Sequence, residues 1–157
     1  MFAVESMGLG TGNRFYVDSG TGTDGAGYGR NPDSPTATVD YAVGLCTASN
    51  GDIIYVMPGH AESLGADSAV DVDVAGVTII GLGSGALRPT FTATAIAGDF
   101  KLAAASIRIE NLLFLSGIDA TTAVTGATFQ MAGGSVYVGN LVNEQGMLST
   151  WTVATNA

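Results

Sequence analysis

The stretch GDIIYVMPGHAESL, residues 51–64, joins a continuous apolar run to a Pro-Gly-His corner. Its four consecutive β-forming residues, IIYV, show no polar alternation, which is typical of a strand in a parallel sheet or covered on both faces. The Pro-Gly pair then predicts a tight turn. His60, the single histidine of the chain, follows directly. The stretch could therefore be an active-site loop or a corner between two strands of a repeating β-structure.

The segment before this strand has a helical period. Apolar residues recur at three and four positions in DYAVGLCTA, Pro35 precedes them, and Asn50-Gly51 supplies a stop signal. We expect one amphipathic helix at about residues 37–47. Cys46 belongs to its apolar face, so we interpret this lone cysteine as a small buried hydrophobe, with no internal disulfide available to it.

A similar short unit recurs from this strand onward. Each unit centres on β-branched or aromatic residues and ends on Gly or Asn, and the four units lie at residues 52–56, 76–83, 106–114 and 126–141. The series is marked by Ile54, Ile79, Ile107 and Phe129. Weaker strand candidates, AVDVDVA, PTFTATA and FKLAA, lie between them. The regular spacing of these short strands predicts an all-β chain coiled into a short parallel β-helix, although a β-sandwich also has short strands at regular spacing. The first turn of such a coil leaves strand edges open, and the helix at 37–47 is placed to cap them.

These segments resemble a known family. The run from FYVDSG through NPDSPTATVDYAVGLCTASNGDIIYVMPGH, then GVTIIGLG and RIENLLF, is similar to the opening turns of right-handed parallel β-helix proteins of the pectate-lyase-like superfamily. More narrowly, it resembles β-helical structural proteins of tailed bacteriophages, both capsid decoration proteins and tail spikes. The likeness covers residues 15–115 and places Asn111 where such coils stack an asparagine at a bend. It implies a homotrimer around the helix axis or an interface beside that axis. Spike relatives continue for many more turns, whereas this chain has about five.

Composition narrows the partners. The net charge is -9, and the chain has only five basic residues, spread from Arg14 to Arg108, so we expect nucleic acid to be repelled. The longest apolar run, around NLLFLSGI, is far shorter than the roughly 20 residues of a membrane span, and the N-terminus lacks the positive charge of a signal peptide. We therefore expect no membrane partner.

His60 is the sharpest candidate for chemistry. As a general base it would need a positioned partner, and Glu62 is near in sequence. GLGSGA comes close to a nucleophile elbow without matching it. The simpler interpretation, which we favour, is that His60 is an ordinary polar residue at the corner.

Two pairs of charged residues offer a polysaccharide-cleaving alternative. Asp71 and Asp73 in VDVDVA would point to one face of a strand, and Arg88 and Arg108 would lie on strands of successive turns. Asp67 could add a calcium ligand. We favour a solvated acidic face for the aspartates and carboxylate partners for the arginines, with Glu110 pairing with Arg108.

We therefore predict three parts: an N-terminal arm at 1–14, a right-handed β-helix domain at 15–145, and a C-terminal edge strand or tail at 146–157. The predicted function is that of a bacteriophage virion protein of the capsid decoration, or cement, type, made in the host cytoplasm and bound outside the head to the major capsid protein. We expect no enzymatic activity, catalytic residue, metal or cofactor. A tail-spike head-binding module is the alternative. The expected capsid contacts are Phe2, Val4 and Met7, and the expected subunit contacts are Leu148, Trp151 and Val153.

Overall fold

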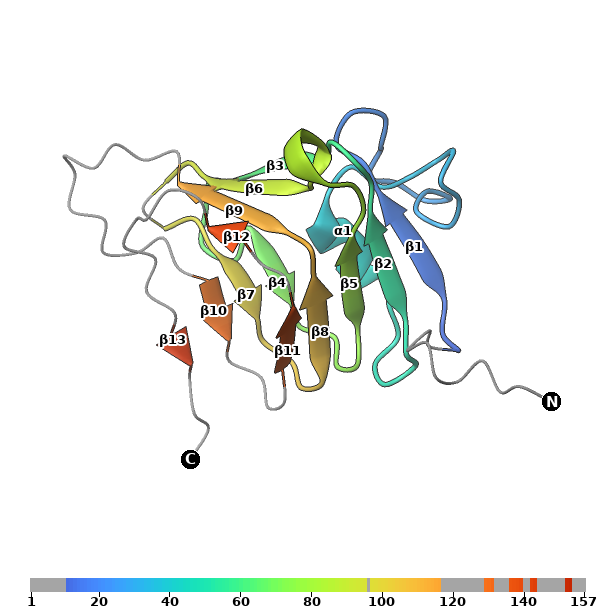
Figure 1. The fold of residues 1–157 in the computed structure, drawn as a ribbon. Coiled ribbons are helices and arrows are strands. Elements are labelled where there is room, and N and C mark those ends of the chain that lie inside the picture. The colour runs from blue at the N-terminus through green and yellow to red at the C-terminus, as the bar shows by residue number, and fades with distance from the viewer. Residues whose placement is uncertain are drawn as a thin grey trace.

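The computed structural model describes residues 11–95 and 97–116, together with the backbone of four further strands at 129–131, 136–139, 142–143 and 152–153. Within these ranges the regular secondary structure is almost all strand, with one α-helix and one 3-10 turn, as the all-β class predicts. Every strand pairing given by the described residues is parallel. The strands form three sheets (Figure 1).

The three sheets are each assembled from strands far apart in the sequence. The first sheet has the order β1 (Arg14–Val17), β2 (Ile53–Val56), β5 (Thr78–Gly81), β8 (Ile107–Glu110) and β11 (Val136–Gly139). The second has the order β3 (Ala61–Leu64), β6 (Thr90–Ala93), β9 (Leu113–Ser116) and β12 (Val142–Asn143). The third has the order β4 (Val70–Val72), β7 (Phe100–Leu102), β10 (Phe129–Met131) and β13 (Thr152–Val153).

The path of the chain among these sheets is regular. From β2 onward it visits the first, second and third sheet in that order, and it completes this circuit four times. Each visit places a new strand beside the strand of the previous circuit. In Figure 1 the strands of the first sheet accordingly follow one another from β1 at the right to β11 at the left.

The register corrects the repeat inferred from the sequence. Ile54 pairs with Ile79, and Ile79 pairs with Ile109 rather than Ile107. Phe129 belongs to the third sheet, where it pairs with Phe100. The predicted series therefore mixed positions from two sheets, because a regular spacing alone does not say which strand of a circuit a residue occupies.

Two other differences concern corners. The strand β3 was not predicted, since Ala61 and Ser63 are exposed and the segment AESL has no apolar alternation. The unit SIRIENLLF is two strands, β8 and β9, separated by a corner at Asn111. Asn111 has a left-handed backbone, with φ of 56°, and its side-chain Nδ2 donates to the carbonyls of Gly81 and Gly83 on the preceding circuit, at 2.8 and 2.9 Å.

The core lies between the three sheets. Side chains that alternate inward along the strands are fully buried, as with Ile54 and Ile79 in the first sheet and Val70 and Val72 in the third. Where the second and third sheets face each other, three aromatic rings meet. Phe91 contacts Phe100 edge to face, with ring centroids 5.1 Å apart, and Phe114 stacks on Phe91 at 5.6 Å. Such pairs stabilise a core beyond the area that they bury.

The helix α1 (Val39–Gly44) lies inside the expected range but is shorter than expected. Thr38 is its N-cap and accepts a hydrogen bond from the Tyr41 N–H through its side chain, at 3.3 Å. The buried face, formed by Val39, Ala42 and Val43, packs against β1, β2 and β4. Figure 1 shows α1 behind β2 and β5, at the N-terminal end of the three sheets.

The Asn111 corner gives a stability prediction. Replacing Asn111 with Ala removes two hydrogen bonds and places a side chain with a poor left-handed propensity at positive φ, so we expect a loss of about 2–3 kcal/mol in the free energy of unfolding. Asn111→Gly, which tolerates this backbone, is the matched control and should lose about 1–2 kcal/mol. Urea unfolding followed by circular dichroism measures both values. Equal values for the two variants would contradict a cost from the left-handed backbone.

Candidate functional site: the polar network at the N-terminal end of the sheets

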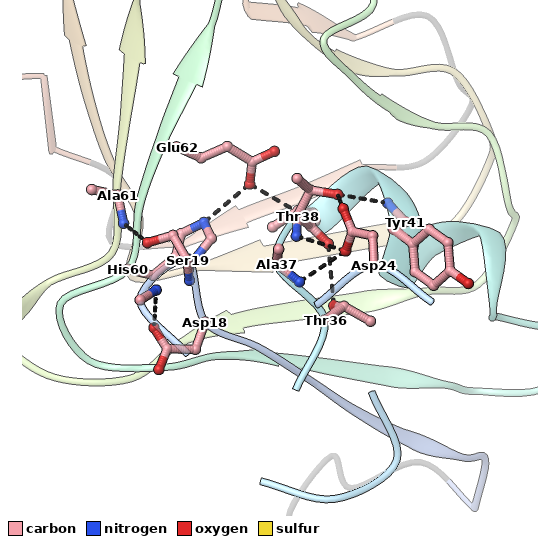
Figure 2. Close-up of polar contacts among 12 residues, drawn as sticks. Asp18, Ser19, Asp24, Thr36, Ala37, Thr38, Tyr41, His60, Ala61 and Glu62 are labelled. Carbon is pink, nitrogen blue, oxygen red and sulfur yellow. Dashed lines mark hydrogen bonds and ion pairs between the residues drawn. The ribbon is translucent and has the colours of Figure 1, made fainter. Parts of the chain in front are cut away.

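The chemistry candidate of the sequence, His60, lies within a network of hydrogen bonds that joins three segments (Figure 2). Its Nδ1 atom accepts a hydrogen bond from the Ser19 N–H at 3.0 Å. Its Nε2 atom lies 3.0 Å from Oε2 of Glu62, and the same oxygen accepts from the Val39 N–H at 3.1 Å. One imidazole and one carboxylate thus connect the loop after β1, the strand β3 and the start of α1.

These contacts define the tautomer of His60. A backbone N–H can only donate, so Nδ1 carries the lone pair and the ring proton resides on Nε2, which donates to Glu62. The residue is only 1% exposed, and its ring lies 5.5 Å from that of Phe91. Glu62 is therefore the partner that the sequence indicated. The interpretation of His60 as a polar corner residue did not extend to its burial, which arises because Ser19, in the loop after β1, covers this corner.

The network is part of a larger closure of strand edges. On β1, the Tyr16 N–H donates to the Gly29 carbonyl at 2.8 Å, and the Tyr16 carbonyl accepts from the Thr36 N–H at 2.9 Å. On β3, the Ala61 N–H donates to Oγ of Ser19 at 2.9 Å. These contacts satisfy backbone groups that the first strand of a sheet otherwise leaves without a partner.

The third sheet is closed by the helix. The Asp71 N–H of β4 donates to Oδ1 of Asp40, on α1, at 3.0 Å. The helix is itself held by Asp24, which accepts from the N–H groups of Ala37 and Thr38 at 2.8 and 3.1 Å. The loop and the helix at residues 18–44 therefore act together on the leading strands of all three sheets.

A second buried carboxylate anchors the start of the described chain. Asp52 is fully buried and accepts from the N–H groups of Asn13 and Thr47, at 2.6 and 2.7 Å, and from the Asn50 side chain at 2.6 Å. Burial disfavours its charge, but these hydrogen bonds outweigh that effect and hold the pKa of Asp52 below its usual value. Asp52 is thus a structural anion.

Asp99 is buried in a less favourable setting. Burial raises the pKa of Asp99 above its usual value, and the nearby charges of Asp67 and Asp71 add to the effect. A hydrogen bond from the Ser68 N–H, at 2.5 Å, and the charge of Lys101 oppose the increase without cancelling it. The contributions of Asp52 and Asp99 to the free energy of unfolding therefore change with pH in opposite directions.

Cys46 is unreactive by its surroundings. It packs against the core, and its thiol donates to the Ala42 carbonyl at 3.4 Å. Burial, with a smaller contribution from the charge of Asp52, raises the pKa of the Cys46 thiol to about 12. The thiolate required for nucleophilic chemistry is thus strongly disfavoured, although the residue is only partly buried rather than the buried hydrophobe that the sequence predicts.

The carboxylates and arginines proposed for sugar cleavage are separated. Asp71 lies on β4 beside Lys101 at 3.6 Å, but β4 ends at Val72, so the expectation that Asp73 shares a strand face with it is wrong. Asp73 is exposed in the following turn, and its N–H donates to the Asp71 carbonyl at 3.0 Å. The alternation of buried valines with an outward carboxylate holds for Val70, Asp71 and Val72.

The arginines also differ from the expectation. Arg108 lies on β8 and pairs with Glu110, its Nε donating at 2.6 Å, as predicted. Arg88 is not on a strand but follows the 3-10 turn Gly85–Leu87 in the connection from β5 to β6. Within residues 11–95 and 97–116, no carboxylate forms an ion pair with Arg88.

Charge is distributed unevenly along the chain. Residues 18–73, which form the loop, α1 and the strands β2 to β4, carry nine carboxylates and one arginine, and hence -8 of the net charge of -9. Residues 74–116 carry three basic and two acidic residues. The strands β2 to β4 and their connections, residues 53–72, contain no Lys or Arg, since the one arginine of this range, Arg30, lies in the loop.

Several sequence predictions fall outside what the structure describes. Phe2, Val4, Met7, Leu148 and Trp151 lie outside the described residues, and of Val153 only the backbone, on β13, is described. Among the described residues, no group of three or more His, Cys, Asp or Glu side chains is arranged to hold a metal ion. No helix in this part of the chain is long and apolar enough to cross a membrane.

Comparisons with known proteins give no match. The chain matches no protein-family model, no curated protein and no solved structure. The polar network must therefore be interpreted from its own geometry.

The two buried aspartates give a paired prediction. Asp52→Asn should lower the free energy of unfolding by about 2 kcal/mol at pH 7, because charged hydrogen bonds are lost and an amide donor faces backbone donors. The stability from a lowered pKa is present above about pH 4 and is lost as the pH falls through the folded value, so the difference from the parent should shrink in acid.

Asp99→Asn is the matched control. Because the pKa of Asp99 is raised, its ionisation costs stability as the pH rises through the folded value, so removal of the charge should be neutral or stabilising at pH 7. Asparagine keeps an acceptor for the Ser68 N–H. Urea unfolding at pH 7 and pH 4 tests both variants, and equal losses for the two at pH 7 would contradict the assignment.

The thiol prediction is kinetic. At pH 8, Cys46 of the native protein should react with iodoacetamide more than about 100-fold more slowly than in the unfolded chain. Labelling followed by mass spectrometry, with and without denaturant, measures the ratio. Comparable rates in the two states would mean that the thiol is accessible and ionised.

Proposed function

We propose that the chain is a short right-handed parallel β-helix whose leading end is capped by residues 18–44. The repeated circuit through three parallel sheets supports this fold, and right-handed connections are the strong rule for parallel strands. The cap is supported by the hydrogen bonds that Ser19, Thr36 and Asp40 form with the leading strands. A coil that is closed at one end presents lateral faces and one further end for docking.

We further propose that it is a bacteriophage virion protein of the capsid decoration type, which binds the major capsid protein outside the head and stabilises the shell. The observation that carries this proposal is the burial of His60, whose two ring nitrogens both serve the cap. The sharpest candidate for chemistry in the sequence thus has an internal structural role, which favours a function carried by surfaces. The resemblance to β-helical phage proteins supports the same conclusion.

In this proposal the molecule is a homotrimer. Phe2, Val4 and Met7 would contact the shell, and Leu148, Trp151 and Val153 would contact a sister subunit. Binding that occurs only in the assembled shell stabilises that state by mass action, and the effect is multiplied over many equivalent sites.

The copy number per virion tests the location. Quantitative mass spectrometry against the major shell protein should give hundreds of copies per particle if the protein decorates the head. A handful of copies would instead place it at the tail, and its absence from purified virions would refute a virion role.

Removal of the arm tests the docking surface. Deletion of residues 1–10 should abolish binding to undecorated particles while leaving the β-sheet circular dichroism unchanged. This boundary keeps Asn13, whose backbone and side chain bond to Asp52. The matched control is the full chain with Phe2, Val4 and Met7 changed to Ser, which should lose binding equally. Binding retained by both variants would eliminate the arm as the shell contact.

A further inference from the structure

His60 is one of the points at which the cap and the sheets are joined. Ser19 makes two contacts to this corner, since its N–H donates to Nδ1 of His60 and its Oγ accepts from the Ala61 N–H. The His60 backbone is also fixed, because its N–H donates to the Met57 carbonyl and its carbonyl accepts from the Thr90 N–H. The imidazole therefore cannot follow the loop if the loop moves. Figure 2 shows Ser19 and Glu62 near His60.

The contact with Ser19 requires a neutral ring. Imidazole is the one side chain whose ordinary titration falls between pH 5 and 8, and both nitrogens are donors once it is protonated. The new proton on Nδ1 would then point at the Ser19 N–H, which is also a donor, from a distance of 3.0 Å between the nitrogens. The opposite side of the ring would gain, because Nε2 already donates to the Glu62 carboxylate.

Several charged groups lie around this corner. Glu62 is the carboxylate that touches the imidazole, and Phe91 supplies an uncharged face. The elements packed around the corner contribute further carboxylates, each engaged with backbone or hydroxyl groups. These are Asp18, bonded to Gly20 and Thr21, Asp24, bonded to Ala37 and Thr38, and Asp40, bonded to Asp71; Arg30 is the basic residue of the loop, and it lies over Phe15.

We propose that His60 is a pH-sensitive latch of the cap. Above the titration range the neutral ring holds Ser19, the start of the loop, against β3. Below that range the protonated ring keeps its bond to Glu62 and releases Ser19, so the start of the loop loosens, while the contacts of Asp24, Gly29 and Thr36 keep the rest of the loop and α1 in place. The Ala61 N–H of β3, which donates to Oγ of Ser19, is the backbone group that this release exposes, whereas the edge of β1 stays covered by Gly29 and Thr36.

Two measurements on the intact protein test the latch. Nitrogen-15 NMR of the imidazole should show the Nε2-protonated neutral tautomer at pH 7.5 and the doubly protonated ring at pH 5. Hydrogen exchange, corrected for the intrinsic effect of pH, should show protection of the Ser19 and Ala61 N–H groups falling about tenfold over the same range, as expected for one lost hydrogen bond. Protection in β2 and β5 should stay constant.

The matched control is His60→Gln, whose amide can accept from Ser19 and donate to Glu62 but does not titrate. Its Ser19 and Ala61 N–H groups should keep the same protection at both values of pH. If this variant does not fold, the comparison of these two groups with β2 and β5 in the parent protein still decides the question. A ring that stays neutral at pH 5, protection of Ser19 and Ala61 that is unchanged after protonation, or a loss of protection throughout the sheets would each overturn the latch.

Discussion

The unpaired edge of a parallel strand is the constraint on which this structure depends. Each strand from β5 onward receives its partner from the preceding circuit, but the strands that begin the sheets have no earlier circuit to pair with. Their buried backbone groups would be costly without partners. The residues between β1 and β2 solve this problem with backbone, hydroxyl and carboxylate groups, through Thr36, Ser19 and Asp40 respectively. The polar network around His60 follows from that requirement.

The same requirement explains why the acidic residues are concentrated near the leading strands. Asp24, Asp40, Asp52 and Glu62 all accept hydrogen bonds from backbone N–H groups at the leading end of the sheets, on the segments before β2 and, for Asp40, on β4. A carboxylate is suited to this task because it accepts several bonds and binds them more strongly than a neutral group does. Later circuits pair with each other and have less need of such acceptors. Acidic residues that appear scattered in the sequence thus share one structural role.

Sequence patterns predicted the strands whose apolar residues alternate or run together, and the helix whose period and stop signal are local. They failed where the outcome depends on contacts between distant segments. The strand β3 was missed because Glu62 takes an inward position that is favourable only when His60 and Val39 lie beside it. The predicted repeat matched Ile79 with Ile107, whereas the structure pairs Ile79 with Ile109. The two-residue error arose because three-dimensional packing sets the length of each corner. Glu62 could be named as the partner of His60 from sequence proximity, but the burial of the ring could not be predicted, since it depends on a loop some forty residues earlier.

The uneven charge gives the molecule an electrical polarity along the direction in which its circuits stack. The leading end carries nearly all of the net negative charge, while the circuits that follow it, over residues 74–116, are close to neutral. Near any charged surface such a molecule experiences a torque before it makes contact, and at physiological salt this acts over roughly 8 Å. It would therefore reach a negatively charged surface with its leading end turned away, and rising ionic strength would weaken that preference.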